Sequence, residues 1–242
     1  MKTPKFIRMI ALYGPWILHT LRFNLHYFPF RQAVKLPVLL VRPRFLNLNG
    51  QIRLEAPVRR GMVRIGVPKT TLFPKERTRL DLNGTLIFKG DCQISAGSVV
   101  NTRRDSVLVF GHQVDISDRA RIICATQIEV GDYFNMSWES VLCDNDFHSM
   151  KSFADGKKRP ATSPIIIAPR CWIGQNALVL KGTNLPAHTV VQAGAVVTRQ
   201  LRCNEYSIIG GNPAQVLSEG KYYRDFKDDK PVIAKPEDRQ PS

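Results

Sequence analysis

Aliphatic side chains recur at every sixth position over the second half of the chain. The longest run has no missing member, and a small residue follows each of its first five members by four positions. The run is Ile167, Ile173, Val179, Leu185, Val191 and Val197, and the small residues are Cys171, Ala177, Thr183, Thr189 and Ala195. Because strand side chains alternate between two faces, every sixth residue lies on the same face. The pattern predicts short strands wound into stacked coils that bury these residues together.

The same register is present upstream in three shorter runs, and one long interruption separates them from the run described above. Its earlier members are Leu82, Phe88, Ile94 and Val100, then Phe110, Ile116 and Ile122, then Val130, Met136 and Leu142. Between Leu142 and Ile167 the period is lost, and the chain reads Cys-Asp-Asn-Asp-Phe-His-Ser-Met followed by a polar run. Functional residues are often held on loops by a rigid scaffold. We therefore expect a protruding loop at 143–164 that carries the chemistry.

The chain has 242 residues, which is enough for one hydrophobic core and does not require a second large domain. We expect an all-β, parallel coil domain at 46–217, preceded by a partly helical cap at 1–45 and followed by a tail at 218–242 that begins as a short helix. The cap spacing predicts short helices broken near Gly14-Pro15, and then an extended edge at 21–27, where apolar and polar residues alternate. Residues 45–79 are expected to form irregular first coils, and Gly84, Gly90, Gly111 and Gly131 are expected to supply positive φ at corners.

Positive charge is concentrated at the start of the chain. Residues 1–80 carry sixteen Lys or Arg against Glu55 and Glu76, which is +14 of the total +15. Such a block favours an anionic partner: a membrane surface, a phosphate-bearing substrate or nucleic acid. The repeat region has no basic face or aromatic nucleic-acid motif, so we expect no nucleic acid. Peripheral contact of residues 1–80 with an anionic membrane is one interpretation, and a simple cap over the open end of the coils is the other.

Cysteine spacing and hydropathy indicate a cytoplasmic protein, with the inner face of the membrane as a possible site of attachment. The five cysteines show no CxxC or Cys/His ligand spacing, which is typical of a reducing compartment. No signal peptide is evident, and the apolar run 9–21 is too short to span a bilayer, which takes about 20 residues.

The repeats and three motifs together resemble the hexapeptide-repeat acyltransferases, which include maltose, galactoside and polysaccharide O-acetyltransferases. The motifs are Trp-Ile-Gly at 172–174, Ala-Gly-Ala-Val-Val-Thr-Arg at 193–199 and Gly-Gly-Asn-Pro-Ala at 210–214, and the similarity covers roughly residues 80–217. The resemblance implies a left-handed β-helix, a homotrimer with the donor cleft between neighbouring subunits, and acetyl-CoA as the donor. It implies transfer of an acetyl group to a hydroxyl of a sugar or glycoconjugate, as in cell-surface polysaccharide biosynthesis.

The loop histidine is the candidate catalytic base. A sugar hydroxyl is a poor nucleophile until its proton leaves, and histidine can accept that proton at neutral pH. The resemblance places the family's catalytic histidine on His148. If the loop is extended, Asp144, Asp146 and His148 share one side, so Asp146 is a candidate to orient the imidazole. Cys143 is a competing nucleophile, although a small buried residue at the last coil is the simpler interpretation.

The donor site is carried over from the resemblance. Trp172 and Gln175 match the coil that lines the pantetheine arm, whereas Ala193, Thr198 and Arg199 match contacts to coenzyme A. The chain departs from the family pattern at Gln215 and Ser218, where basic residues are usual. We expect Lys221 or Arg224 to replace them.

The acceptor site is less marked, and two other functions stay open. Asn135, Trp138 and Glu139 lie on the coil that leads into the loop and are candidates for acceptor binding. A zinc-dependent, carbonic anhydrase-like enzyme of the same fold needs three ligands, but the loop supplies one histidine, while His112 and His188 lie in turns. We therefore expect no metal. A non-catalytic scaffold is the second alternative.

Overall fold

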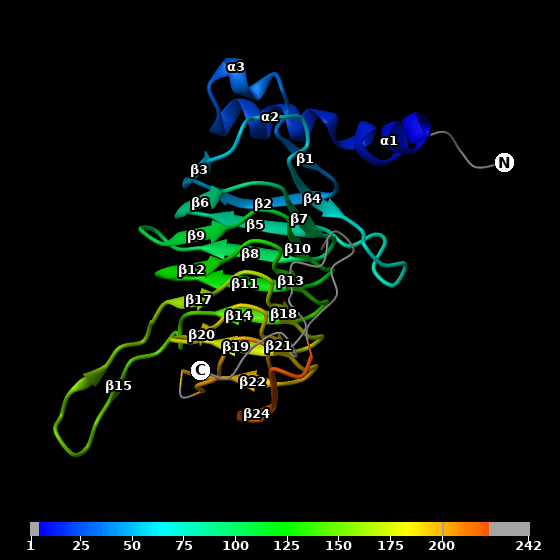
Figure 1. The fold of residues 1–242 in the computed structure, drawn as a ribbon. Coiled ribbons are helices and arrows are strands. Elements are labelled where there is room, and N and C mark those ends of the chain that lie inside the picture. Colours follow the sequence, from blue (N-terminus) through cyan, green and yellow to red (C-terminus); the bar gives the residue numbers. More distant parts are fainter. Residues whose placement is uncertain (1–4, 200, 223–242) are drawn as a thin grey trace.

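The computed structural model describes residues 5–199 and 201–222, in which short parallel strands form a three-faced prism (Figure 1). Strands that follow one another in sequence belong to different faces, and each pairs with strands of the preceding and following coils. We call the faces A, B and C in the order in which the chain visits them. The expected parallel β-helix is thereby confirmed.

Face A is the widest of the three faces in the described residues. Its strands are β1 (Val38–Leu40), β4 (Val63–Val67), β7 (Cys92–Ser95), β10 (Val114–Ile116), β13 (Asn135–Met136), β18 (Trp172–Ile173), β21 (Val190–Val191), β23 (Ser207–Gly211) and β24 (Ala214–Glu219). The last pair, β23 and β24, is antiparallel and closes the C-terminal end of this face.

Faces B and C are entirely parallel. Face B contains β2 (Pro43–Leu48), β5 (Thr78–Leu82), β8 (Val99–Thr102), β11 (Arg121–Cys124), β14 (Val141–Cys143), β19 (Leu178–Leu180) and β22 (Val196–Val197). Face C contains β3 (Gln51–Leu54), β6 (Thr85–Phe88), β9 (Val107–Phe110), β12 (Gln127–Val130), β17 (Ile165–Ile167) and β20 (Asn184–Leu185). Residues 45–79 are more regular than expected, because β2, β3 and β4 pair in parallel with the next coil, although β2 and β4 each contain one register shift.

The six-residue register forms the core. Each member named above, from Leu82 to Val197, is at most 1% exposed, and the small residues that follow the later members are also buried. Members on one face stack directly on one another across coils, as Phe88 does on Phe110, with ring centroids 5.2 Å apart and planes at 17°. A single coil buries little apolar area, so the core exists only because the coils are stacked.

The corners differ from expectation. Gly84, Gly90, Gly111 and Gly131 do not have positive φ; that conformation recurs at other corner positions, including Arg170, Asn176, Gly182, His188 and Gly194. These residues are six apart, and each precedes an inward aliphatic residue by three. Gly131 is needed for space instead, because a Cβ there would lie 2.5 Å from the backbone nitrogen of Pro169 on the next coil.

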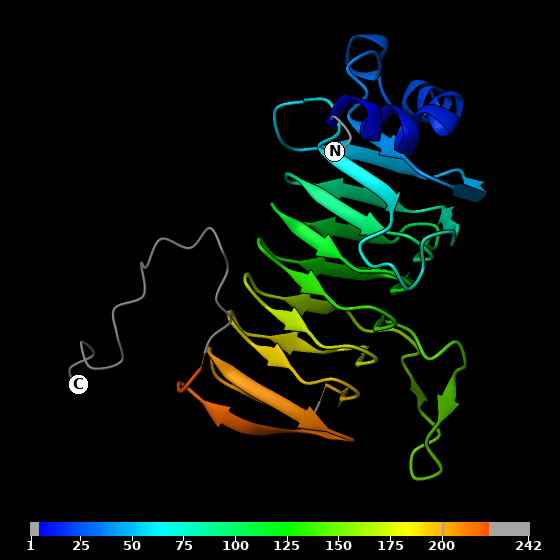
Figure 2. The same cartoon turned by 90° about the vertical axis from the view of Figure 1, so that its right-hand side faces the viewer.

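Helices cover the N-terminal end of the prism (Figures 1 and 2). They are α1 (Lys5–Tyr13), the 3-10 turn η1 (Gly14–Trp16), α2 (Ile17–Tyr27) and α3 (Phe30–Ala33), so the break near Gly14-Pro15 is confirmed. The extended edge expected at 21–27 is wrong. Residues 20, 23 and 24 of α2 are buried, and their three- and four-residue spacing places them on one face of a helix. A helix therefore buries these side chains together.

The buried face of α2 replaces a missing strand at the edge of face A. The Asn24 side chain donates to the Val38 carbonyl at 2.8 Å and accepts from the Val38 amide at 3.1 Å. The Thr20 hydroxyl accepts from the Leu40 amide at 3.1 Å. These bonds satisfy backbone groups that an edge strand leaves unpaired.

The C-terminal end departs from the expected helix after residue 217. Ser218 and Glu219 continue strand β24, and a bend follows at residues 220 and 221. Residues 223–242, which include Arg224, lie outside the described residues.

Replacing Phe110 by Ala is expected to lower the free energy of unfolding by about 3–5 kcal/mol, because the ring is fully buried between stacked coils. Chemical denaturation measures this loss. Leu46→Ala on β2, where the side chain is 49% exposed, is the control and should cost under about 0.5 kcal/mol. Equal losses in the two variants would contradict a shared stacked core.

Candidate active site

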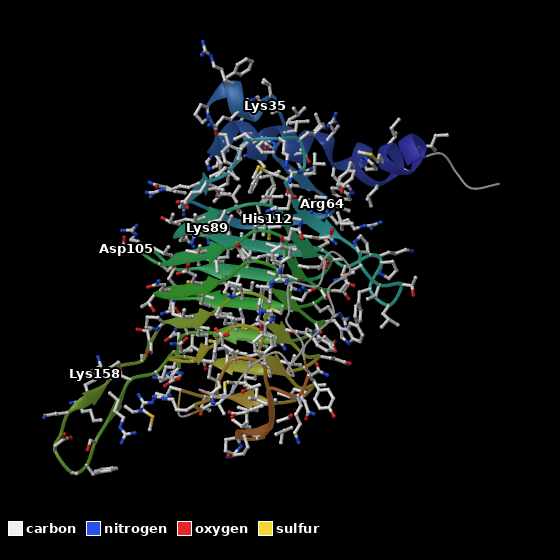
Figure 3. The ribbon with its side chains drawn as sticks, viewed as in Figure 1. Lys35, Arg64, Lys89, Asp105, His112 and Lys158 are labelled. Carbon is white, nitrogen blue, oxygen red and sulfur yellow. The ribbon has the colours of Figure 1, made fainter. Side chains whose placement is uncertain are left out.

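The protruding loop leaves the prism between faces B and C. It runs from the end of β14 to the start of β17 and contains the antiparallel pair β15 (Met150–Lys151) and β16 (Lys158–Arg159). Figures 1 and 2 show this hairpin standing away from the coils, and Figure 3 shows Lys158 well clear of them. The loop therefore lies beside the B–C corner, where the chain passes from face B to face C.

Asp144 fixes the base of this loop. Its carboxylate is fully buried and accepts hydrogen bonds from the backbone amides of Ala125, Thr126 and Gln127 at 2.6, 2.7 and 2.9 Å. The predicted arrangement, with residues 144, 146 and 148 on one side, is wrong. Asp144 points into the corner whereas residues 146 and 148 are exposed, and the positive φ of Phe147 (63°) breaks the extended geometry.

His148 lies in a hollow of about 590 Å³ at the B–C corner. The hollow is lined by residues of the loop and of the two later coils: Asp146, His148, Met150, Arg159, Pro160, Leu180, Lys181, Thr198 and Arg199. The structure thus brings four of the predicted site residues together, namely His148, Asp146, Thr198 and Arg199. They come from segments 50 residues apart because the coils stack face B strands on one another.

Lys181 is a member of this site that the sequence analysis missed. Its ammonium forms an ion pair with the Asp146 carboxylate at 2.5 Å and donates to the Pro160 carbonyl at 2.6 Å, so it holds both sides of the loop. One signal could have revealed it. Lys181 and Arg199 are eighteen residues apart, which is three repeats of six, so the period places both at the same corner on successive coils.

The other donor-site candidates lie at a different corner. Trp172, Gln175 and Ala193 follow or belong to strands of face A and lie at the A–B corner, where Gln175 accepts from the Gly194 amide at 2.8 Å. The Trp172 ring is 37% exposed, and its indole nitrogen donates to the Ser137 hydroxyl at 2.9 Å. Lys221 is exposed beyond β24.

The acceptor candidates also group at the A–B corner. Asn135, Trp138 and Trp172 line a second hollow of about 300 Å³, to which Lys69 and Thr70 contribute. Glu139 does not line this hollow. Its carboxylate forms an ion pair with the Arg119 guanidinium at 3.1 Å. Neither group of candidates touches His148 within one chain.

Two histidines of the coils have structural contacts. The ring of His188 stacks on Tyr206 with ring centroids 4.3 Å apart, and the partly exposed ring of His112, labelled in Figure 3, packs edge-on to Tyr133 with centroids 6.1 Å apart. Within residues 5–199 and 201–222 there is no group of three or more His, Cys, Asp or Glu residues that could hold a metal ion. None of the helices in the same part of the chain has the length and apolar character that a bilayer crossing requires.

Comparisons with known proteins agree with this architecture. No family model matches the chain. A 75-residue stretch, 31% of the chain, is 33% identical to a 2,3,4,5-tetrahydropyridine-2,6-dicarboxylate N-acetyltransferase of Staphylococcus aureus, of which it spans 30%. The crystal structure of the polySia-specific acetyltransferase NeuO superposes with a TM-score of 0.50 at 14% identity, covering 80% of this chain and 81% of that one. AntD, an N-acyltransferase from Bacillus cereus, scores 0.39 at 15% identity.

A short stretch of the chain is thus similar to a curated acetyltransferase, and the fold matches that of a solved acetyltransferase structure. The chain has a left-handed β-helix fold, as the expected fold class required. The matched stretch covers under a third of the curated relative, so the reaction that this chain performs is taken up below as a proposal.

Cys143→Ala is expected to retain acyl transfer within about twofold, because burial raises the pKa of this thiol and so disfavours the nucleophilic thiolate at neutral pH. The thiol also donates to the Asn145 carbonyl at 3.1 Å. Steady-state rates of the purified variant check this. A loss of a hundredfold or more with an unchanged melting temperature would instead identify Cys143 as the nucleophile.

Proposed function

We propose that this protein transfers an acetyl group from acetyl-CoA to a hydroxyl of a sugar or glycoconjugate, with His148 as the general base. The observation that carries the proposal is the hollow that His148 shares with Thr198 and Arg199. An imidazole beside a guanidinium, on a loop fixed by buried hydrogen bonds, suits proton removal next to a phosphate-bearing donor. The similarity to acetyltransferases supports the same class of reaction.

The chemistry assigned to these groups is direct transfer. His148 accepts the proton of the acceptor hydroxyl while the hydroxyl oxygen attacks the thioester carbonyl. The resulting tetrahedral intermediate expels the thiolate of coenzyme A, and the imidazolium of His148 gives its proton to that thiolate. Asp146 lies in the same hollow, but its carboxylate binds Lys181, so its part in orienting His148 requires an exchange of partners. In the arrangement seen here, Asp146 positions Lys181.

We propose further that the working site forms between subunits of a homotrimer. The donor candidates Thr198 and Arg199 lie at the B–C corner with His148, whereas Trp172, Gln175 and Ala193 lie at the A–B corner. One acyl-CoA molecule could contact both sets if the A–B corner of a neighbouring subunit faced this B–C corner. A contact between two different surfaces closes into a ring when its rotation allows, and a ring of three is what the resemblance to the hexapeptide-repeat acyltransferases implies.

His148→Ala is expected to lower kcat/KM by about 10²–10⁴-fold, because the acceptor hydroxyl loses its base. The measurement is release of free coenzyme A with a panel of sugars and nucleotide sugars. Ser149→Ala, the adjacent exposed loop residue, is the matched control and should keep the wild-type rate. Full activity in His148→Ala would refute the catalytic assignment, whereas absence of coenzyme A release by the wild type would favour a scaffold role.

We also propose that the helical cap binds the anionic inner face of the cytoplasmic membrane. No acidic residue precedes Glu55 in the sequence, and nine basic residues do. The helices and the turn after them expose large apolar side chains, which are Ile7, Met9, Ile10, Ile17, Leu18, Leu21, Leu25, Phe30 and Val34. On α2 the exposed apolar side chains lie between the buried face and the polar face of Arg22 and His26, because Leu18 and Leu25 are four and three residues from Arg22. Apolar side chains flanked by cations are typical of helices that lie in a membrane interface.

Vesicle sedimentation tests this contact. We expect binding to rise with the anionic lipid fraction and to fall with salt, and Leu18→Ser/Leu25→Ser to weaken it about tenfold or more, since each leucine would otherwise be buried in lipid. Leu217→Ser, at an equally exposed position at the opposite end of the prism, serves as the control (Figure 1). Binding that ignores anionic lipid content would refute the proposal.

A further inference from the structure

A second concentration of positive charge lies on the outer side of face B, near the helical cap. Arg44 on β2 and Arg79 on β5 are register partners on adjacent parallel strands, and both side chains are exposed. Neighbouring strands are about 4.8 Å apart, and like charges at directly opposed positions destabilise a sheet. A pair of this kind is more stable when an anion lies between the two guanidinium groups.

These two arginines line a hollow of about 470 Å³ together with Lys75 and Arg77. The hollow is walled by the connection between β4 and β5, whose position is fixed by hydrogen bonds. The Arg77 guanidinium donates to the Pro43 carbonyl at 3.2 Å, and the Arg42 guanidinium donates to the Pro74 carbonyl at 2.8 Å. The four cations are therefore carried by anchored backbone.

The carboxylates near this hollow are bound to other groups. Glu76 lines it but forms an ion pair with Arg119 at 2.7 Å, and Arg119 also stacks on the Phe73 ring at 4.1 Å. Asp81, two residues beyond Arg79 on β5, accepts three side-chain amides, from Asn47, Asn83 and Asn101, at 2.7–2.9 Å. Among the described residues, Arg44, Lys75 and Arg79 have no ion pair or side-chain hydrogen bond, so their charges are available to a ligand.

We propose that this hollow, which we call the arginine hollow, binds the phosphate or diphosphate group of a phosphate-linked saccharide acceptor. Guanidinium forks match phosphate oxygens in geometry. A phosphate monoester carries roughly −1.5 to −2 at pH 7, which balances several cations better than a single carboxylate does. The inference rests on the proposed acetyl transfer and deepens it by naming the acceptor class.

The position of the arginine hollow fits such an acceptor. The connection between β4 and β5 contributes Lys69 and Thr70 to the hollow at the A–B corner and Lys75 and Arg77 to the arginine hollow. The two hollows therefore share a wall. A saccharide beside Trp138 and its phosphate beside Arg44 and Arg79 would extend along one surface, with the phosphate at the end of the prism that carries the helical cap and the saccharide nearer its middle.

Isothermal titration with inorganic pyrophosphate tests the site independently of any transfer activity. We expect saturable binding of one pyrophosphate per wild-type chain and at least about tenfold weaker binding in Arg44→Gln/Arg79→Gln. Arg121→Gln is the matched control, because Arg121 is exposed in the same outward row, two strands beyond Arg79, and should bind like the wild type. Without phosphate, the double variant should melt no lower than the wild type, because a like-charge pair is removed.

Several outcomes would overturn the inference. The first is absent or unsaturable pyrophosphate binding by the wild type, and the second is an equal loss of binding in Arg121→Gln.

Steady-state kinetics identify the source of the phosphate. The double variant should have a higher KM for a phosphate-linked saccharide, with kcat and the KM for acetyl-CoA unchanged. A raised KM for acetyl-CoA instead would assign the site to the donor, and lost binding to anionic vesicles alone would assign it to lipid headgroups. Failure of the proposed function would show differently, as intact pyrophosphate binding without any acetyl transfer.

Discussion

The whole structure depends on burying one side chain in every six. A strand of two to six residues cannot persist alone, and a single coil has almost no interior. Stacking Phe88 on Phe110, and each later member of the register on the one before, turns many small burial gains into one continuous core. Strands of successive coils are hydrogen-bonded to one another, and these bonds fix the positions of the corners between faces. Those corners then serve as attachment points for functional groups.

The site uses this rigidity in two ways. Repetition places Lys181 and Arg199 at one corner without any local sequence signal, because three repeats of six return the chain to the same edge. The long interruption of the repeat supplies what a regular prism cannot, which is a histidine on a loop that projects from the coils. Asp144 makes that interruption tolerable, since its buried carboxylate satisfies three backbone amides where the corner would otherwise lose partners.

The distribution of charge follows the axis of the prism. The N-terminal end combines exposed apolar helices with unpaired arginines on face B, whereas the hollow that His148 lines is closer to the opposite end. Like charges kept side by side, as at Arg44 and Arg79, cost stability unless a ligand offsets them. A membrane-facing cap, a phosphate site and a transfer site in this order would suit an acceptor whose sugar is carried on a phosphate.

The sequence by itself determined the coil architecture, the inward residues, the break near Gly14-Pro15 and the loop that carries His148. It could do so because a burial period of six is a local pattern that survives without tertiary information. It failed at 21–27, where alternation suggested a strand but Thr20 and Asn24 pair with β1, and at Asp144, whose buried partners lie some twenty residues away. Only the tertiary structure decided that Asp146 binds Lys181 and that the donor candidates divide between two corners. Contacts between coils depend on which edge each side chain reaches, and spacing alone does not give the direction of a side chain.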